Sequence, residues 1–287
     1  FATNNDGWSI GAVAPDGWVE VPGNSETYGT DNFLVMKYEA KAWSVDGSGN
    51  PVSVVEDGGA SSGDGWAGGN TQTDYRAVSS AEGRPWVEIG QAHGTYYDAR
   101  EACTDAYQIA GLTTGSTHLI TNDQWMTLAR NIDQVPENWT SGSVGVGMLN
   151  RGHSDNNPGN SLAASSNDSE AWYGMTGDNF ERDYNKRTHT LSNGKIIWDL
   201  SGNVWNWTDG QILGSDKPLG GGTAWVEWTS VTDFNGDTAG LEGPLECEDC
   251  YPHEYLPTNS SWDSSNGIGQ YYQGSASGGP YAFRRGA

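Results

Sequence analysis

The sequence predicts a single α+β domain in which two helices pack on short, twisted antiparallel strands. Three observations lead to this prediction. Two segments carry a helical apolar period, and several short segments run apolar or alternate between turn signals. In addition, 41 of the 287 residues are glycine, so extensive irregular loops are expected.

The chain is strongly acidic, with a formal charge of −23. Binding to nucleic acid or to anionic membranes requires Lys/Arg patches, so the composition argues against both. The sequence contains no apolar run of about 18 residues, so no membrane-spanning helix is predicted. The composition instead favours a secreted, marine or salt-tolerant protein with a solvated acidic surface. The alternative is that some carboxylates bind cations such as Ca²⁺.

Strands are expected in the first third of the chain. Trp18–Val21 lies between two Pro/Gly turns, and Phe33–Trp43 begins apolar and then alternates, which predicts one strand buried at one end. Val52–Val55 follows a Gly-rich turn and predicts a hairpin. Residues 56–82 read as a long surface loop, and Pro85–Ile89 as a short strand.

The clearest helix is predicted over Tyr97–Tyr107. Asp98 stands where an N-cap is expected, with Glu101 three residues later. Small and aromatic residues recur on one face of this helix. Cys103 belongs to that face, so it is expected in the core and not as a nucleophile.

A second helix is predicted to start at Thr121 or Asn122. Trp125, Leu128 and Ala129 share its apolar face. Farther on, Thr190–Trp198 predicts a hairpin with an Asn-Gly turn. This hairpin leads into the block Trp198–Trp207, which reads WDLSGNVWNW.

Three stretches together resemble one family: Phe33–Lys41, the helix pair over 98–131, and the block Trp198–Trp207. They are similar to the C-type lectin fold in its formylglycine-generating-enzyme (sulfatase-modifying-factor) version. The closing Phe283–Gly286 resembles that family's C-terminal segment. The resemblance implies one domain over residues 1–287, with a scaffold over 1–221 and a variable ligand-binding region over 222–287.

One branch of this family is enzymatic and oxidises a substrate cysteine at a copper site built from two cysteines. Here Cys247 and Cys250 have a shorter spacing and acidic neighbours, and the histidines are too scattered for an iron site, so the enzymatic expectation weakens. The Cys-x-x-Cys pair is expected as a disulfide or as two thiols, since no second ligand pair completes a zinc site.

The other branch contains the variable proteins of diversity-generating retroelements, which display a hypervariable C-terminal surface. Residues 222–283 are dense in the residue types that adenine mutagenesis of Asn codons produces. The resemblance implies a non-enzymatic protein that binds a protein or other macromolecular ligand or receptor, outside the cell or displayed on a virus or cell surface. The alternatives are a copper/thiol oxidase and a structural surface or phage-tail-like protein.

Tyr, Trp, Ser, Gly and Asn dominate the C-terminal region, a mixture typical of adaptable binding surfaces. Three tryptophans there, Trp225, Trp228 and Trp262, are expected mostly in the core. The predicted ligand-binding residues are Tyr251, His253, Tyr255, Tyr271, Tyr272 and Tyr281.

The block Trp198–Trp207 carries a second prediction. In the enzymes that it resembles, such a block holds a structural Ca²⁺ through side-chain and backbone oxygens. The matching positions are Asp199, Gly202, Val204 and Asn206. The alternative is a tight turn in which Asp199 and Asn206 bond backbone amides while the three tryptophans of the block fill the core.

Overall fold

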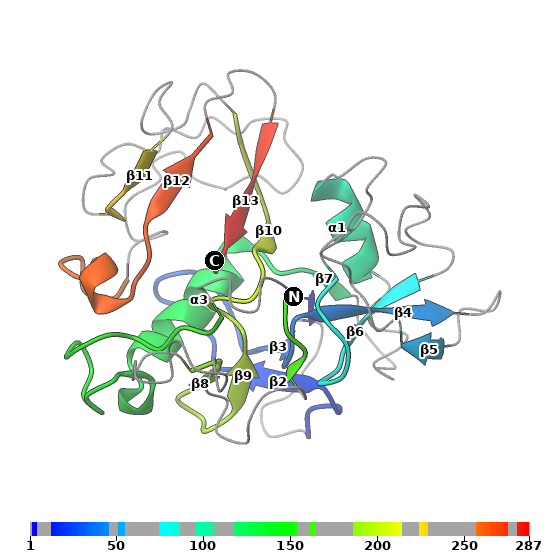
Figure 1. Cartoon of the computed structure of the whole chain (residues 1–287), viewed down its shortest axis with the longest axis horizontal. Coiled ribbons are helices and arrows are strands. Elements are labelled where there is room, and N and C mark those ends of the chain that lie inside the picture. The colour runs from blue at the N-terminus through cyan, green and yellow to red at the C-terminus, as the bar shows by residue number, and fades with distance from the viewer. Residues whose placement is uncertain are drawn as a thin grey trace.

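A computed structural model shows the arrangement of the chain (Figure 1). The residues that it describes are 2–4, 13–45, 51–54, 75–86, 96–104, 106, 117–153, 161–164, 186–213, 224–228, 257–274 and 280–286.

Two α-helices lie within these ranges, α1 (Tyr96–Thr104) and α3 (Asn122–Asp133), together with the short 3-10 helices η1 (Pro136–Asn138) and η6 (Ser264–Asn266). The strands pair antiparallel throughout. Few helices and short antiparallel strands agree with the predicted α+β class. In the described part of the chain, neither helix has the length and apolar content needed to cross a bilayer.

A four-stranded sheet in the order β2-β3-β1-β7 forms the base of the molecule. Its strands are β1 (Ala2–Asn4), β2 (Trp18–Val21), β3 (Phe33–Met36) and β7 (Thr117–Leu119). All four side chains of β3 are buried, as expected of an apolar strand that is covered on both faces. The predicted strands over Trp18–Val21 and at Phe33 are confirmed.

The predicted single strand Phe33–Trp43 is wrong in its second half. After Met36 the Lys37 N–H donates to the Gly17 carbonyl at 2.8 Å, and the Lys37 carbonyl accepts from Trp198 N–H at 2.9 Å. The first bond extends the β2–β3 pairing by one residue, and the second ties the backbone after β3 to Trp198. The chain then continues as β4 (Ala40–Val45) in a second sheet.

That second sheet has the order β5-β4-β6, with β5 (Pro51–Val54) and β6 (Tyr75–Ser79). The β4–β5 pairing confirms the predicted hairpin partner. β6, however, lies inside the segment predicted as a surface loop. Five residues of β6 pair with β4, so a partner that is distant in sequence decides its conformation.

Both predicted helices are present, with one correction. α3 begins with a capping box, in which Gln124 N–H donates to Thr121 Oγ1 at 3.2 Å and Thr121 N–H donates to Gln124 Oε1 at 3.0 Å. α1 begins at Tyr96, so Asp98 lies in its first turn and is not the N-cap. Cys103 of α1 is buried, as predicted.

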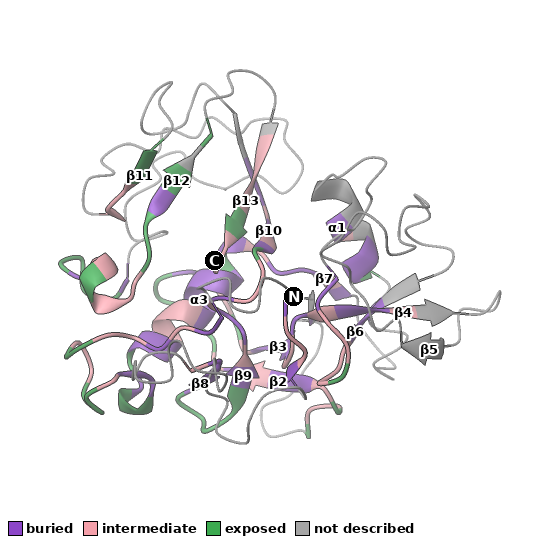
Figure 2. Cartoon of the chain, in the orientation of Figure 1, coloured by how far each residue is buried: buried purple, intermediate pink, exposed green. Residues whose placement is uncertain are grey.

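The core lies between α3, the first sheet and a hairpin (Figure 2). The hairpin joins β8 (Thr188–Thr190) to β9 (Ile196–Trp198), and Gly194 in its loop has a φ of 78°, whereas Asn193 lacks the positive φ of a two-residue Asn-Gly turn. The predicted hairpin is confirmed, but the predicted turn is wrong. From α3 the core takes Trp125, Leu128 and Ile132, whereas Ala129 is half-buried beside them.

Two further strand pairs complete the described chain. β10 (Asn206–Leu213) pairs with β13 (Pro280–Arg285), and β11 (Ala224–Val226) pairs with β12 (Tyr271–Gln273). Figure 1 shows the β11–β12 pair at the edge of the molecule opposite β4, β5 and β6. The block Trp198–Trp207 therefore continues directly into β10, which pairs with β13.

Candidate functional site

Three of the six predicted ligand-binding residues lie within the described chain. Tyr272 is 43% exposed, Tyr281 is half-buried, and Tyr271 is 8% exposed and therefore buried. The positions outside the described residues are Tyr251, His253 and Tyr255.

A cavity of about 470 Å³ brings the three described tyrosines together between α3, β12 and β13. This volume is in the range of small-molecule sites, about 300–1,000 Å³. The lining is rich in aromatic side chains. These are Trp125, Trp205, Trp225, Trp228, Tyr271, Tyr272, Tyr281 and Phe283.

Three exposed rings form a cluster beside this cavity, which we name the ring cluster: Trp205, Trp225 and Tyr272. Their exposed fractions are 41%, 54% and 43%, respectively. The ring centroids of Trp225 and Tyr272 are 4.8 Å apart, and those of Trp205 and Trp225 are 6.3 Å apart. These rings touch one another while still presenting apolar surface to solvent.

The prediction that Trp225 and Trp205 fill the core is therefore wrong. Trp225 lies on β11, at the edge of the molecule, directly opposite Tyr272 of β12. Trp262 is 9% exposed and packs edge-on against Trp139, with centroids 4.8 Å apart, so its core prediction is confirmed. Trp228 is half-buried and lies 5.4 Å from the Tyr271 ring.

Sequence reasoning missed the arginines of the site. The guanidinium carbon of Arg284 lies 4.5 Å from the centroid of Trp205 and 5.3 Å from that of Trp207. Arg285 donates to Asn122 Oδ1. From the sequence, Phe283–Gly286 is interpreted only as a resemblance to a family segment. Two adjacent arginines in a chain with 14 basic residues could have indicated a positively charged site.

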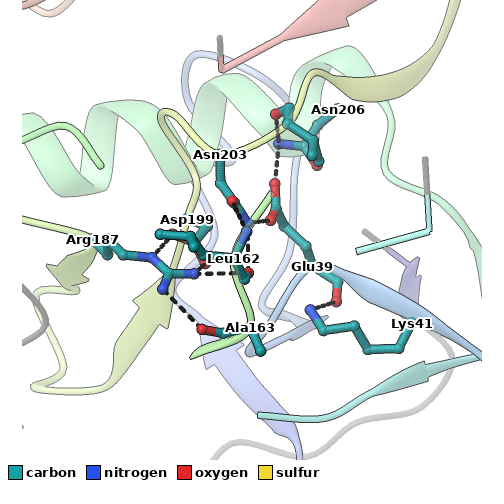
Figure 3. A network of polar contacts seen from close by, with 9 residues as sticks. Glu39, Lys41, Leu162, Ala163, Arg187, Asp199, Asn203 and Asn206 are labelled. Carbon is teal, nitrogen blue, oxygen red and sulfur yellow. Dashed lines mark hydrogen bonds and ion pairs between the residues drawn. The ribbon is translucent and has the colours of Figure 1, made fainter. Parts of the chain in front are cut away.

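The block Trp198–Trp207 contributes Leu200, Ser201 and Trp205 to the lining of the cavity. A buried ion pair holds the start of the block (Figure 3). Arg187 Nε donates to Asp199 Oδ1 at 2.6 Å, and Arg187 Nη2 donates to Asp199 Oδ2 at 2.5 Å. The side chain of Arg187 is fully buried, and its other donor bonds reach the carbonyls of Leu162 and Ala163. This bidentate geometry is the strongest that a guanidinium and a carboxylate can form.

The predicted calcium positions can be compared with this geometry. Both Asp199 oxygens already accept from Arg187, and Asn206 Nδ2 points at Glu39 Oε1, 3.5 Å away. Within the described ranges, no group of three or more His, Cys, Asp or Glu side chains surrounds a metal position. In this arrangement the residues do not offer calcium a carboxylate, so ion binding would require Arg187 to move away.

Backbone conformation fixes the block in place. Gly202 has a φ of 90° and its N–H donates to the Gly286 carbonyl at 2.5 Å, while a Cβ at Gly202 would lie 2.7 Å from the Gly152 carbonyl carbon. Asp199 and Asn203 also have positive φ, 55° and 64°. Three residues in left-handed conformation make this a tight turn, but Asp199 bonds Arg187 and Asn206 points at Glu39, not at backbone amides as the alternative prediction describes.

A second buried carboxyl, Glu39, lies next to the block (Figure 3). Asn203 Nδ2 donates to its Oε2 at 2.5 Å, and Lys41 Nζ donates to its backbone carbonyl at 2.7 Å. Burial, together with the charge of Asp199, raises the pKa of Glu39 to about 8. Burial also lowers the pKa of Lys41 to about 8.

Thiol chemistry finds no support at Cys103, because burial raises the pKa of its thiol to about 11. Cys247 and Cys250, the pair on which the oxidase alternative depends, lie outside the described residues.

No protein-family model matches this chain, and comparison with curated proteins and with solved structures gives no match either. The likeness to the C-type lectin fold therefore rests on the three sequence stretches alone.

Proposed function

We propose that this chain is a non-enzymatic binding protein that presents an adaptable C-terminal surface on a C-type lectin scaffold of the formylglycine-generating-enzyme type. The observation that carries the proposal is the ring cluster. Trp205, Trp225 and Tyr272 expose large rings beside a cavity. Exposed aromatic surface of this kind is typical of binding sites, because rigid rings supply contact area at low conformational cost.

The proposed partner is a protein or another macromolecule, met outside the cell or at a virus or cell surface. The net charge of −23 supports a solvated, extracellular surface and opposes nucleic-acid partners. A structural calcium ion at the block Trp198–Trp207 stays a prediction from the resemblance.

Diversification by a retroelement is the sharper part of the proposal. Its support is the composition of residues 222–283, rich in Tyr, Ser, Asn, Asp, Thr and Gly. The test is to sequence this region from many sibling genes together with their flanking DNA. We expect substitutions confined to codons reachable by adenine mutagenesis, with a reverse transcriptase gene and a template copy nearby. A uniform sequence with neither neighbour would overturn it.

The oxidase alternative has a separate test. Replacing Cys247 and Cys250 by serine abolishes a copper- or thiol-dependent oxidase and leaves a binding protein unchanged. A substrate thiol that is oxidised by the wild-type chain and not by this variant would favour the enzyme. A structural surface or tail protein would show neither oxidation nor a specific ligand.

A further inference from the structure

The charge around the cavity differs in sign from that of the whole chain. Four arginines line it among the described residues: Arg130, Arg151, Arg284 and Arg285. Asp133 is the one acidic residue in the same lining, whereas the chain has 37 acidic and 14 basic residues. Among the described residues, four arginines thus lie at the cavity beside which aromatic rings are exposed.

The acid in the lining is already engaged. Asp133 accepts from Thr258 N–H at 3.0 Å, from Thr258 Oγ1 at 2.8 Å and from Gln134 Nε2 at 2.8 Å. His189, also in the lining, is kept neutral, since burial lowers its pKa to about 4. Among the described lining residues the arginines therefore outnumber the acid, and the nearby Glu227 carboxylate is bonded to Gln270 at 2.7 Å.

Most of these arginines are held by neighbouring groups. Arg285 bonds Asn122, and Arg130 lies 5.3 Å from the centroid of the Tyr28 ring. They contribute positive potential from fixed positions.

Arg284 is different. Its guanidinium lies against the indole rings of Trp205 and Trp207, and no carboxylate or carbonyl among the described residues accepts a hydrogen bond from it. A guanidinium has five N–H donors in one plane, and ring contacts leave them available for a carboxylate, sulfate or phosphate. Desolvation lowers the pKa of Arg284, while the residue stays exposed and its donors remain within reach of a ligand.

We propose that the cavity binds an anionic group carried on a flat, apolar ring. The anion bonds the donors of Arg284, and the ring packs against Trp205 and Trp225 of the ring cluster. The inference rests on the proposed binding function and adds to it the chemical class of the ligand. A macromolecular partner would present the same chemistry as an acidic group next to an aromatic one.

Three small probes with one ring test this inference: indole-3-acetate (anionic), 3-methylindole (neutral) and tryptamine (cationic). Affinities are measured by isothermal titration calorimetry at low ionic strength. We expect indole-3-acetate to bind about tenfold more tightly than 3-methylindole, which corresponds to about 1.4 kcal/mol, and tryptamine to bind most weakly. The net charge of −23 by itself favours the opposite order, so the expected order reports the local site.

Two variants separate the role of Arg284 from that of total charge. Arg284→Gln is expected to reduce the affinity for indole-3-acetate to that of 3-methylindole and to leave the neutral probe unchanged. Lys195→Gln removes the same charge from an exposed position in the β8–β9 turn and is expected to change no affinity. Arg284→Lys retains the charge but loses the planar donors, so a partial loss is expected. Equal melting temperatures of these variants establish that they are folded.

Other results overturn the inference in distinguishable ways. Equal affinity for the three probes, lost in Trp225→Ala, would retain a binding surface and reject the preference for anions. Tighter binding of tryptamine would mean that the global charge dominates. If no probe binds, the ligand class is rejected, while the proposed function is decided separately by the sequence survey of residues 222–283.

Discussion

Arg187 shows how one side chain can stabilise a turn that the sequence marks as a metal site. Its guanidinium is fully buried and both oxygens of Asp199 accept from it. Removing one member of a buried ion pair leaves an uncompensated charge, which typically costs about 3–5 kcal/mol. Removing Arg187 or Asp199 alone is therefore expected to lower the free energy of unfolding more than replacing both by apolar residues.

We expect Arg187→Met to lower the free energy of unfolding by about 3–5 kcal/mol, measured by denaturant titration. The double variant Arg187→Met/Asp199→Leu is expected to recover much of that loss, because no buried charge remains. Lys195→Met, at an exposed turn position, is the matched control. A single variant as stable as the control would show that Arg187 does not balance Asp199.

Calcium at the same block has its own test, by metal removal. A structural ion predicts calcium in the purified protein by elemental analysis and a melting temperature that falls in the presence of a chelator. Such a result would mean that Arg187 leaves Asp199 when the ion binds. Protein without calcium, with an unchanged melting temperature, would contradict the prediction and leave Arg187 as the cation at Asp199.

Among the elements, the pairing of β10 with β13 connects the block to the end of the chain. Gly286 follows β13, has a φ of 78°, and its carbonyl accepts from Gly202 N–H. A Cβ at this position would lie 2.2 Å from the Leu200 carbonyl oxygen. Any substitution of Gly286 would therefore destabilise the fold through both backbone strain and steric overlap with Leu200.

Gly286→Ala is expected to cost at least about 1–3 kcal/mol of unfolding free energy, the range for a residue forced into a sparsely populated conformation. Thermal and denaturant unfolding measure the loss. Gly274→Ala is the control, because a Cβ there would meet no atom of the described residues within 4 Å. Equal stability of the two variants would contradict the close approach of Gly286 to the block.

Elements with local signals could be predicted from the sequence, whereas those that depend on distant partners could not. The helix predicted to start at Thr121 or Asn122 is confirmed, and the capping box that begins it is formed within four residues. β6 forms because it pairs with β4, and the exposure of Trp225 depends on where β11 lies in the molecule. Neither of these is visible in a short window of sequence.

The site was predictable to the same degree. In the observed hairpin Thr188 pairs with Trp198, so Arg187 and Asp199 are the next pair outward. A two-residue Asn-Gly turn would pair Thr188 with Asp199 instead, so the predicted turn did not carry the register that forms the ion pair. The position of Arg284 beside Trp205 and Trp207 depends instead on β13 pairing with β10, which joins segments far apart in the chain.

For the whole molecule, Glu39 links stability to pH. The folded carboxyl keeps its proton up to a pKa of about 8, whereas the unfolded one loses it near the ordinary value of 4.5. Between these values the folded state binds more protons, so stability falls as pH rises. Lys41, lowered to about 8, acts with the opposite sign, and only above that pH.

Glu39→Gln is expected to flatten the decline in unfolding free energy between pH 5 and 7.5, as measured by denaturant titration at each pH. One group contributes at most about 1.4 kcal/mol per pH unit. Glu137→Gln, at an exposed carboxyl of η1, is the control for the change in net charge. Parallel curves for wild type and Glu39→Gln would show that Glu39 ionises alike in both states.

The pairing of Leu213 with Pro280 has a consequence for the evolution of the molecule. Because these residues are register partners, the two ends of the segment 214–279 lie side by side on the scaffold. The entropy of closing a flexible loop grows only with the logarithm of its length, so a doubling costs about 0.6 kcal/mol. We therefore expect insertions within this segment to leave the β10–β13 pairing in place as long as Trp262 keeps its contact with Trp139 and Thr258 its bonds to Asp133.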